Sequence, residues 1–159
     1  MGTGMNKSII SATFALASLI PIPMAVYLYK NNKYNNYVDM QLIDSVYSRS
    51  LVDVEKKVGL GANVNFKDER LDTPLGTACS SDDLDIIRFL LENGADPNEP
   101  NAEGYTPLMY SCQNVNVDAV KLLIDYGAKP LQITTARRSA MDIAIEYKNQ
   151  KILDIMHKK

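Results

Sequence analysis

The chain lacks the residues that most catalytic sites need. It has no tryptophan, one histidine and two cysteines among 159 residues, and neither its histidine and cysteines nor its carboxylates show metal-ligand spacing. A phosphate-binding P-loop is absent, and so is the Gly-x-Ser-x-Gly pattern of serine hydrolases. The sequence therefore predicts a protein that is not an enzyme, has no small-molecule substrate and uses no metal or other cofactor.

A basic excess is also missing. The formal net charge is −2, which argues against a nucleic-acid binder. The charge is unevenly distributed: residues 61–132 contain 5 lysines and arginines against 12 aspartates and glutamates, and residues 133–159 contain 6 against 3. This acidic middle predicts a partner with a basic patch and a salt-sensitive association rate.

Charge is absent from one long stretch near the N-terminus. Residues 8–29 contain 22 uncharged positions in a row, and roughly 20 apolar residues are enough to cross a bilayer. Pro21 and Pro23 disfavour a buried helix of a soluble domain. We expect residues 8–33 to form a transmembrane anchor or uncleaved signal helix behind an n-region at residues 1–7, which contains a second methionine at Met5. A cleaved signal peptide is the competing interpretation.

The flanking charges set the orientation of such an anchor only weakly. Lys7 precedes the uncharged stretch, and Lys30 and Lys33 follow it, so the positive-inside comparison is close to a tie. The short n-region resembles that of a signal peptide, which favours translocation of the domain behind the anchor. The expectation is a single-pass membrane protein whose remaining domain lies outside the cytoplasm, in the periplasm if the source is a bacterium.

What the sequence does contain is a repeat with a period of 33 residues. Gly-Ala dipeptides begin at Gly61, Gly94 and Gly127, and Thr-Pro-Leu begins at Thr73 and again at Thr106. A weaker copy of the second phrase is Ser139-Ala140-Met141. Self-similarity at such a period is the signature of a stacked repeat architecture.

Helix-capping residues follow the same period. A proline after Thr73 or Thr106 suits the first helical position, and a glycine at Gly94 or Gly127 suits the residue that follows a helix. Each repeat therefore predicts a turn, a helix, a short loop and a second helix. A strong N-cap residue precedes each second helix: these are Ser50, Asp83, Asn116 and Asn149.

This pattern resembles the ankyrin repeat. The family's Gly-x-Thr-Pro-Leu-(His)-x-Ala-(Ala) phrase matches Gly104–Cys112, and its Leu-Leu-x-x-Gly-Ala-Asp-x-Asn ending matches Leu90–Asn98. The resemblance implies an all-α solenoid over residues 34–159, preceded by the N-terminal hydrophobic helix. Its repeats are expected at about residues 34–66, 67–99, 100–132 and 133–159.

The match departs from the family in two places. The first repeat has Met40-Gln41-Leu42 where Thr-Pro-Leu is expected, as suits a terminal unit. Leu71 and Arg137 occupy the position of the turn glycine Gly104, which leaves the shape of those two turns open.

The two cysteines lie 33 residues apart, at Cys79 and Cys112, where the family usually has a buried alanine. We expect both to be small core residues. A disulfide between them is not expected, because packed helices lie about 8–10 Å apart and a bridge needs Cα atoms within about 7 Å.

The resemblance implies protein recognition through the turn fingers, which are the loops around residues 69–72, 102–105 and 135–138, and through the exposed ends of the first helices. Tyrosine and arginine are frequent interface hot spots, so Tyr105, Tyr110 and Arg70 are the leading candidates. The full predicted set is Glu69, Arg70, Asp72, Ser80, Ser81, Ala102, Glu103, Tyr105, Tyr110, Gln113, Asn114 and Arg138.

Three functions fit these features. The first is a membrane-tethered module that captures and inhibits a partner, as an immunity protein inhibits a toxin or enzyme. The alternative is an adaptor or scaffold subunit that recruits a partner to a membrane without inhibiting it. A secreted protein with a cleaved N-terminus is the third.

Overall fold

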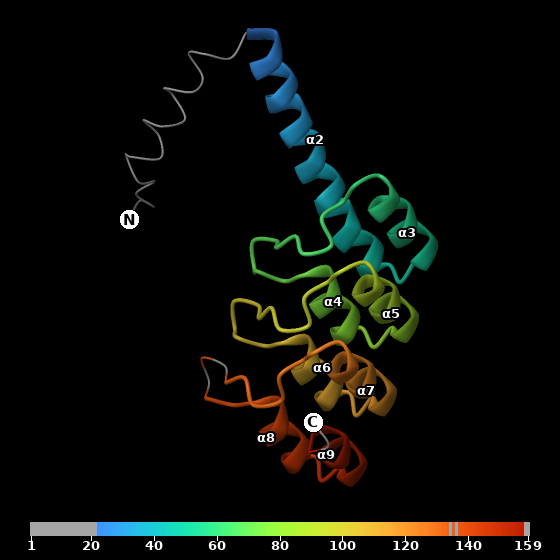
Figure 1. Ribbon diagram of the computed structural model, residues 1–159, viewed down its shortest axis with the longest axis vertical. Coiled ribbons are helices and arrows are strands. Elements are labelled where there is room, and N and C mark those ends of the chain that lie inside the picture. The colour runs from blue at the N-terminus through green and yellow to red at the C-terminus, as the bar shows by residue number, and fades with distance from the viewer. Residues whose placement is uncertain (1–21, 134, 136, 158–159) are drawn as a thin grey trace. The chain divides into compact units, whose positions relative to one another are not determined.

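The structure, a computed structural model, describes residues 22–133, 135 and 137–157, with side chains from residue 35 onward. This part of the chain is helical and contains no strand (Figure 1). The chain divides into two compact units, Met1–Tyr37 and Val38–Lys159. The helices are α2 (Ile22–Tyr47), α3 (Leu51–Gly59), α4 (Pro74–Ser80), α5 (Leu84–Glu92), α6 (Pro107–Gln113), α7 (Val117–Asp125), α8 (Ala140–Glu146) and α9 (Gln150–His157).

Helix α2 begins inside the predicted anchor and continues without a break to Tyr47. Pro23 is its second residue, where a proline is tolerated because the first N–H groups of a helix have no intrahelical acceptor. Within the described residues, none of the helices combines the length and apolar character needed to cross a membrane. The predicted n-region and residues 8–21 of the predicted anchor lie outside the described part.

The 33-residue period of the sequence reappears in the helix starts. The inner helices α4, α6 and α8 begin at residues 74, 107 and 140, and the outer helices α3, α5, α7 and α9 begin at residues 51, 84, 117 and 150. Thr73, Thr106 and Ser139 cap the inner helices, each accepting a hydrogen bond from a backbone N–H three residues on. The predicted helix-turn-helix repeat is confirmed.

The predicted N-caps of the outer helices are confirmed as well. Ser50, Asp83 and Asn116 accept from the backbone N–H groups of Asp53, Ile86 and Ala119. The side chain of Asn149 accepts from Ile152 N at 3.1 Å. Each cap satisfies a donor that the helix itself leaves unpaired.

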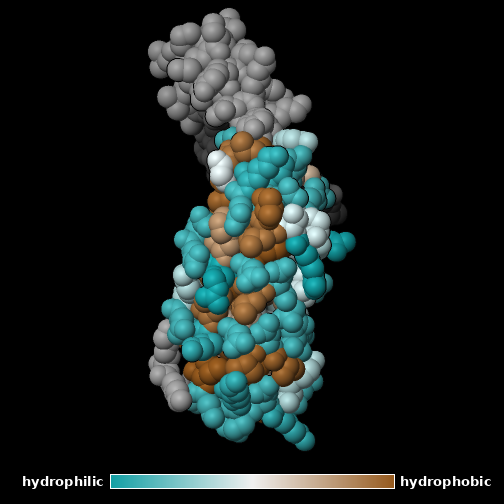
Figure 2. All heavy atoms as spheres, turned by 90° about the vertical axis from the view of Figure 1, so that its right-hand side faces the viewer, coloured by the Kyte–Doolittle hydropathy of each residue, from teal (hydrophilic) through white to brown (hydrophobic). Residues whose placement is uncertain are grey.

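Stacking of the repeats builds one continuous core in the unit Val38–Lys159. Inner helix α6 packs between α4 and α8, and outer helix α7 packs between α5 and α9. Leu42 of α2, Leu75 of α4 and Leu108 of α6 belong to the same buried cluster as Leu123 of α7. In Figure 1 the long loops project from the inner helices on the side away from the outer helices. Figure 2 shows the outer side, where hydrophobic bands alternate with a mainly hydrophilic surface.

Both cysteines are buried in this core as free thiols, as expected. Burial raises the pKa of Cys79 and of Cys112 to about 12. Loss of solvation disfavours the charged thiolate, so both side chains act as small apolar core groups.

Each repeat uses the left-handed backbone region at equivalent positions. Gly104 has φ 83°, and Leu71 and Arg137 at the equivalent positions have φ 59° and 56°. The three turns therefore share a left-handed residue at this position although only one of them has glycine. The same region is also adopted after the inner helices, at Arg49, Asp82, Val115 and Lys148, and after the outer helices, at Gly61, Gly94 and Gly127.

Asparagine side chains join the loops of neighbouring repeats. Asn65 donates to Gly94 O at 3.0 Å and accepts from Asp96 N at 2.8 Å. One period later, Asn98 donates to Gly127 O at 3.1 Å and accepts from Lys129 N at 2.9 Å. These pairs fix the spacing of successive repeats on the edge that follows the outer helices.

Candidate partner-binding face

The finger loops ahead of the inner helices are shaped by their own side chains. In the first of them, Asp68 Oδ1 accepts from the backbone N–H groups of Arg70 and Asp72, both at 2.8 Å. In the next, Asn101 Oδ1 accepts from Glu103 N at 3.0 Å and Tyr105 N at 2.9 Å. The fingers are therefore held in a defined conformation, which lowers the entropy cost of binding.

Neighbouring fingers are hydrogen-bonded to one another. Ala102 N donates to Arg70 O at 2.9 Å, and Thr135 Oγ1 donates to Glu103 O at 3.0 Å. Ala102, a predicted binding residue, thus joins two fingers through its backbone. The side chains of Glu69, Arg70 and Glu103 remain exposed on the fingers.

Two predicted tyrosines meet where the second finger enters α6. The ring centroids of Tyr105 and Tyr110 are 5.4 Å apart, and the rings are tilted by 34°. Gln113, also predicted, donates to Tyr105 OH at 3.3 Å. The pair is half-buried against the core and half-exposed. Such rigid, partly exposed aromatic groups are suited to anchoring a partner.

Asn101 connects this tyrosine pair to an acidic group. Its Nδ2 donates to Tyr110 OH at 2.9 Å and to Asp72 Oδ1 at 3.1 Å. Burial, followed by the negative charges of Asp72 and Glu103, raises the pKa of Tyr110 to about 12. The phenol therefore stays neutral at physiological pH, and the surface around it has a negative potential.

The structure adds a tyrosine that sequence reasoning missed. Tyr47, at the end of α2, lines a hollow of about 50 Å³ together with Asp72, Ser80 and Tyr110. Tyr47 precedes the predicted residue Ser80 by one period, so the repeat register itself could have identified it. The first repeat lacks the Thr-Pro-Leu phrase, so its register positions were not compared with those of the later repeats.

Other predicted residues act in holding the stack together. Asn114 donates from Nδ2 to Cys79 O at 2.9 Å and to Ser80 O at 3.3 Å, which joins the ends of α4 and α6. The carbonyl of Ser81 accepts from the side chain of Arg49. Arg138 forms an ion pair with Glu146 of α8, one repeat further along the stack than the Tyr47 hollow.

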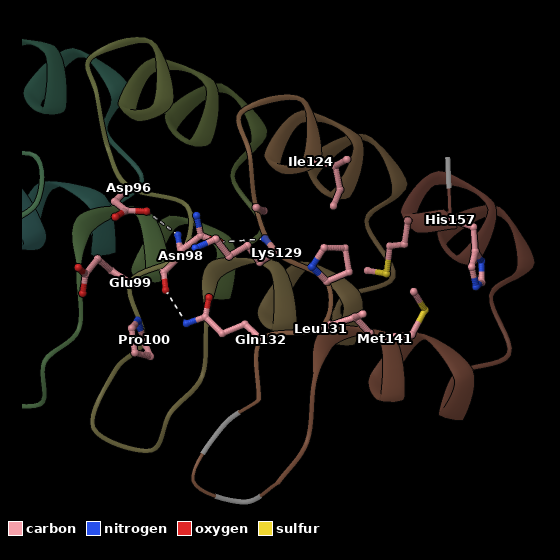
Figure 3. A pocket seen from close by; sticks show the side chains of 13 residues that line it. Asp96, Asn98, Glu99, Pro100, Ile124, Lys129, Leu131, Gln132, Met141 and His157 are labelled. Carbon is pink, nitrogen blue, oxygen red and sulfur yellow. Dashed lines mark hydrogen bonds between the residues drawn. The ribbon is translucent and has the colours of Figure 1, made fainter. Parts of the chain in front are cut away.

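A second, larger recess lies near α9 (Figure 3). It has a volume of about 1000 Å³ and is walled by Ile124, Leu131 and the two methionines Met141 and Met156. Leu131 stands at the register position of Asn65 and Asn98 and is 71% exposed. Gln132 donates to Asn98 O at 2.9 Å beside this recess. This recess was not predicted, although the change from asparagine to leucine at this register position distinguishes the last repeat from the two before it.

The described side chains offer no alternative site with obvious chemistry. Among them, no group of three or more histidine, cysteine or acidic residues is placed to hold a metal ion. The candidate surface is that of the fingers and inner-helix ends, the side that is concave in solenoids of this type, and it offers hydrogen bonds, aromatic contacts and negative charge.

Comparison with known proteins agrees with this architecture. A family model described as ankyrin repeats (three copies) matches residues 42–135 and 100–159. The fowlpox virus ankyrin repeat protein FPV240 is 30% identical over 114 residues, which are 62% of this chain and 27% of that protein. Human protein phosphatase 1 regulatory subunit 27 is 40% identical over 63 residues, 40% of this chain and 41% of that protein. The chain thus spans less than half the length of either relative.

Proposed function

The chain belongs to the ankyrin-repeat family, and from this premise we propose that its concave face captures a partner protein and inhibits it. Ankyrin-repeat proteins are generally binding modules without catalytic activity, so the general function of this chain is to bind another protein. Inhibition of the bound partner is the more specific part of the proposal.

The observation that carries the proposal is the ordered surface around Tyr105 and Tyr110. The two rings are in contact, and Asn101 of the second finger links Tyr110 to Asp72 by donating a hydrogen bond to each. An interface needs a central aromatic cluster with polar groups around it, and this surface has both.

A relative supports a regulatory outcome of binding. One similar protein is named as a regulatory subunit of protein phosphatase 1. A non-catalytic repeat module that occupies a partner's surface can block access to that partner's active site. By this analogy, the partner of the present chain is a toxin or an enzyme whose activity falls when it is bound.

We also propose that the protein is tethered to a membrane through residues 8–29, with its repeats outside the cytoplasm. The support is the uncharged 22-residue stretch of the sequence. Carbonate extraction of native membranes tests the tether, and protease protection of the repeats tests their side. Release of the intact chain by carbonate would contradict the anchor.

The binding function is tested by co-purification with the tagged full chain from native membranes and from the soluble fraction. Glu69→Lys reverses a charge on an exposed finger, and Glu92→Lys makes the same change at an exposed position of α5. We expect Glu69→Lys to reduce the recovered partner at least tenfold and Glu92→Lys to leave it within twofold of wild type. Equal recovery with both variants would contradict the concave face as the binding surface.

The inhibitory function is tested on the partner so identified. Its activity is measured while purified wild-type chain is added to stoichiometric amount, with Glu69→Lys as the matched control. A fall in activity with wild type alone supports inhibition. Undiminished activity of a fully bound partner would replace the inhibitor by an adaptor that recruits without blocking.

A further inference from the structure

The hollow beside Tyr47 is lined by residues of three helices, α2, α4 and α6. Gly76 of α4 lines it, where the equivalent residue of the next repeat is Met109. This hollow of about 50 Å³ lies between α2, α4 and α6. Because one water molecule takes up about 30 Å³ of liquid, this space admits only the end of a single side chain.

A buried hydroxyl in the wall of the hollow has no hydrogen-bond partner. Thr77 is 4% exposed, and its Oγ1 makes no hydrogen bond. Buried polar groups are nearly always paired, because an unpaired one loses its solvation without compensation. This oxygen is itself buried, so it is an unsatisfied group inside the wall and is not presented to an incoming group.

The charge of the hollow indicates the kind of group that it can bind. Asp72 lines it and receives one hydrogen bond, from Asn101. Among the side chains that the structure describes, ion pairs form between Lys67 and Glu99 and between Arg138 and Glu146, so no cation pairs with Asp72. A positively charged group would neutralise this carboxylate and could contact the faces of Tyr47 and Tyr110.

We propose that the hollow receives a lysine or arginine side chain of the partner protein, paired with Asp72 and flanked by Tyr47 and Tyr110. This inference rests on the proposed function and adds to it the chemistry of the partner's anchoring residue. A protein partner is favoured over a free cation because the hollow opens on the same face as Tyr105 and the fingers.

The test is a titration of the ¹⁵N-labelled full chain with acetylated, amidated Gly-Gly-Arg-Gly-Gly and its lysine counterpart, followed by amide chemical shifts. The control peptide carries citrulline, which has nearly the shape of arginine without its charge. We expect the basic peptides to shift the amides of Thr77 and Tyr110 and the citrulline peptide to bind at least tenfold more weakly. Equal binding of the citrulline peptide, or no shift with either basic peptide, would overturn the proposal.

Three variants locate the effect. Asp72→Asn should weaken the basic peptides at least tenfold, whereas Asp125→Asn, the same change at an exposed position of α7, should alter binding less than twofold. Thr77→Val should raise the melting temperature, because it removes an unpaired buried hydroxyl, and should alter binding less than twofold. A purely structural role would move stability and binding together. Equal effects of Asp72→Asn and Asp125→Asn would also overturn the proposal.

Failure here is distinguishable from failure of the proposed function. If the peptides do not bind but Glu69→Lys still abolishes capture of the native partner, the concave face remains the binding surface and the basic anchor is rejected. If both fail, the face itself is wrong.

Discussion

At the residue scale, backbone conformation decides where the repeats tolerate sequence change. After each inner helix the chain enters the left-handed region, and none of the four residues that do so is glycine. After each outer helix the equivalent residues are Gly61, Gly94 and Gly127. A left-handed conformation costs an ordinary L-residue about 1–2 kcal/mol, so the loops after the inner helices are under more strain than the loops after the outer helices.

Val115 is the most strained of these positions, because a β-branched residue fits poorly at its φ of 58°. Its side chain is 42% exposed, so its removal sacrifices little packing. Relief of about 1–2 kcal/mol, less about 0.4–1 kcal/mol for the extra freedom of glycine when unfolded, predicts that Val115→Gly stabilises the protein by about 0.5–1 kcal/mol. Urea denaturation followed by circular dichroism measures the change.

The reverse substitution provides the control. Gly94 has φ 86° with open space around its Cα, so Gly94→Val meets strain rather than a clash. A loss of at least about 1–2 kcal/mol is expected. Gly94→Val with wild-type stability would refute the assignment of that residue as the left-handed end of α5.

The cysteines allow a second test at this scale. Burial raises the pKa of both thiols to about 12, so at pH 8 they are neutral as well as inaccessible. We expect Ellman's reagent to leave both unreacted in the native protein, and the reaction rate in urea to follow the unfolded fraction. A fast reaction of one thiol equivalent without denaturant would show that Cys79 or Cys112 is exposed.

At the element scale, stability comes from the junctions between repeats. Each described helix apart from α2 is 7–9 residues long, which is too short to persist alone. The inner helices pack on one another, the outer helices do the same, and the asparagine pairs join the loops after the outer helices. Stability of such a stack is close to a sum of repeats and interfaces, so weakening one interface affects cooperativity as well as total stability.

Asn98 offers the clearest test of a junction. Asn98→Ala removes the hydrogen bonds to Gly127 O and Lys129 N, and a loss of about 1–2 kcal/mol is expected. Asn93→Ala is the matched control: its side chain is exposed and bonds only to Phe89 O of its own helix, at 2.8 Å. The free energy of unfolding from urea titrations should fall clearly more for Asn98→Ala. Equal losses would mean that the inter-repeat hydrogen bonds stabilise the fold no more than a hydrogen bond within one helix does.

At the scale of the whole molecule, the charge distribution governs association. The acidic residues 61–132 include the finger carboxylates Glu69 and Glu103 and the Asp72 side chain, so most of the proposed binding face lies within the most negative part of the chain. A negative field attracts a basic partner over a distance comparable to the Debye length, about 10 Å at 0.1 M salt.

The association rate of the captured partner should therefore fall steeply with salt. Between about 50 mM and about 500 mM sodium chloride we expect at least a tenfold decrease in the on-rate and a smaller change in the off-rate, measured by surface plasmon resonance. Circular dichroism over the same range serves as the control for an unchanged fold. An on-rate independent of salt would argue against electrostatic steering and against a basic partner.

The repeat architecture was predictable because its signals are local. Thr73, Thr106 and the four outer-helix caps act on N–H groups three residues away, and the glycines after the outer helices act at their own positions. The sequence alone was therefore enough to predict the repeat period, the starts of the repeat helices and the burial of the two cysteines. The shape of the turns at Leu71 and Arg137 was not predictable, because stacking rather than local propensity imposes their conformation.

The site divides in the same way. The sequence by itself determined which surface would be presented, since Tyr105, Tyr110, Asp72 and Ser80 follow from their positions in the repeat. Only the tertiary structure decided how they combine. Asn101 joins Tyr110 to Asp72, Asn114 joins the ends of α4 and α6, and Tyr47 lines the same hollow as Gly76. The physical reason is that every repeat has the same local signals, whereas contacts across the stack depend on which side chains neighbouring repeats bring together.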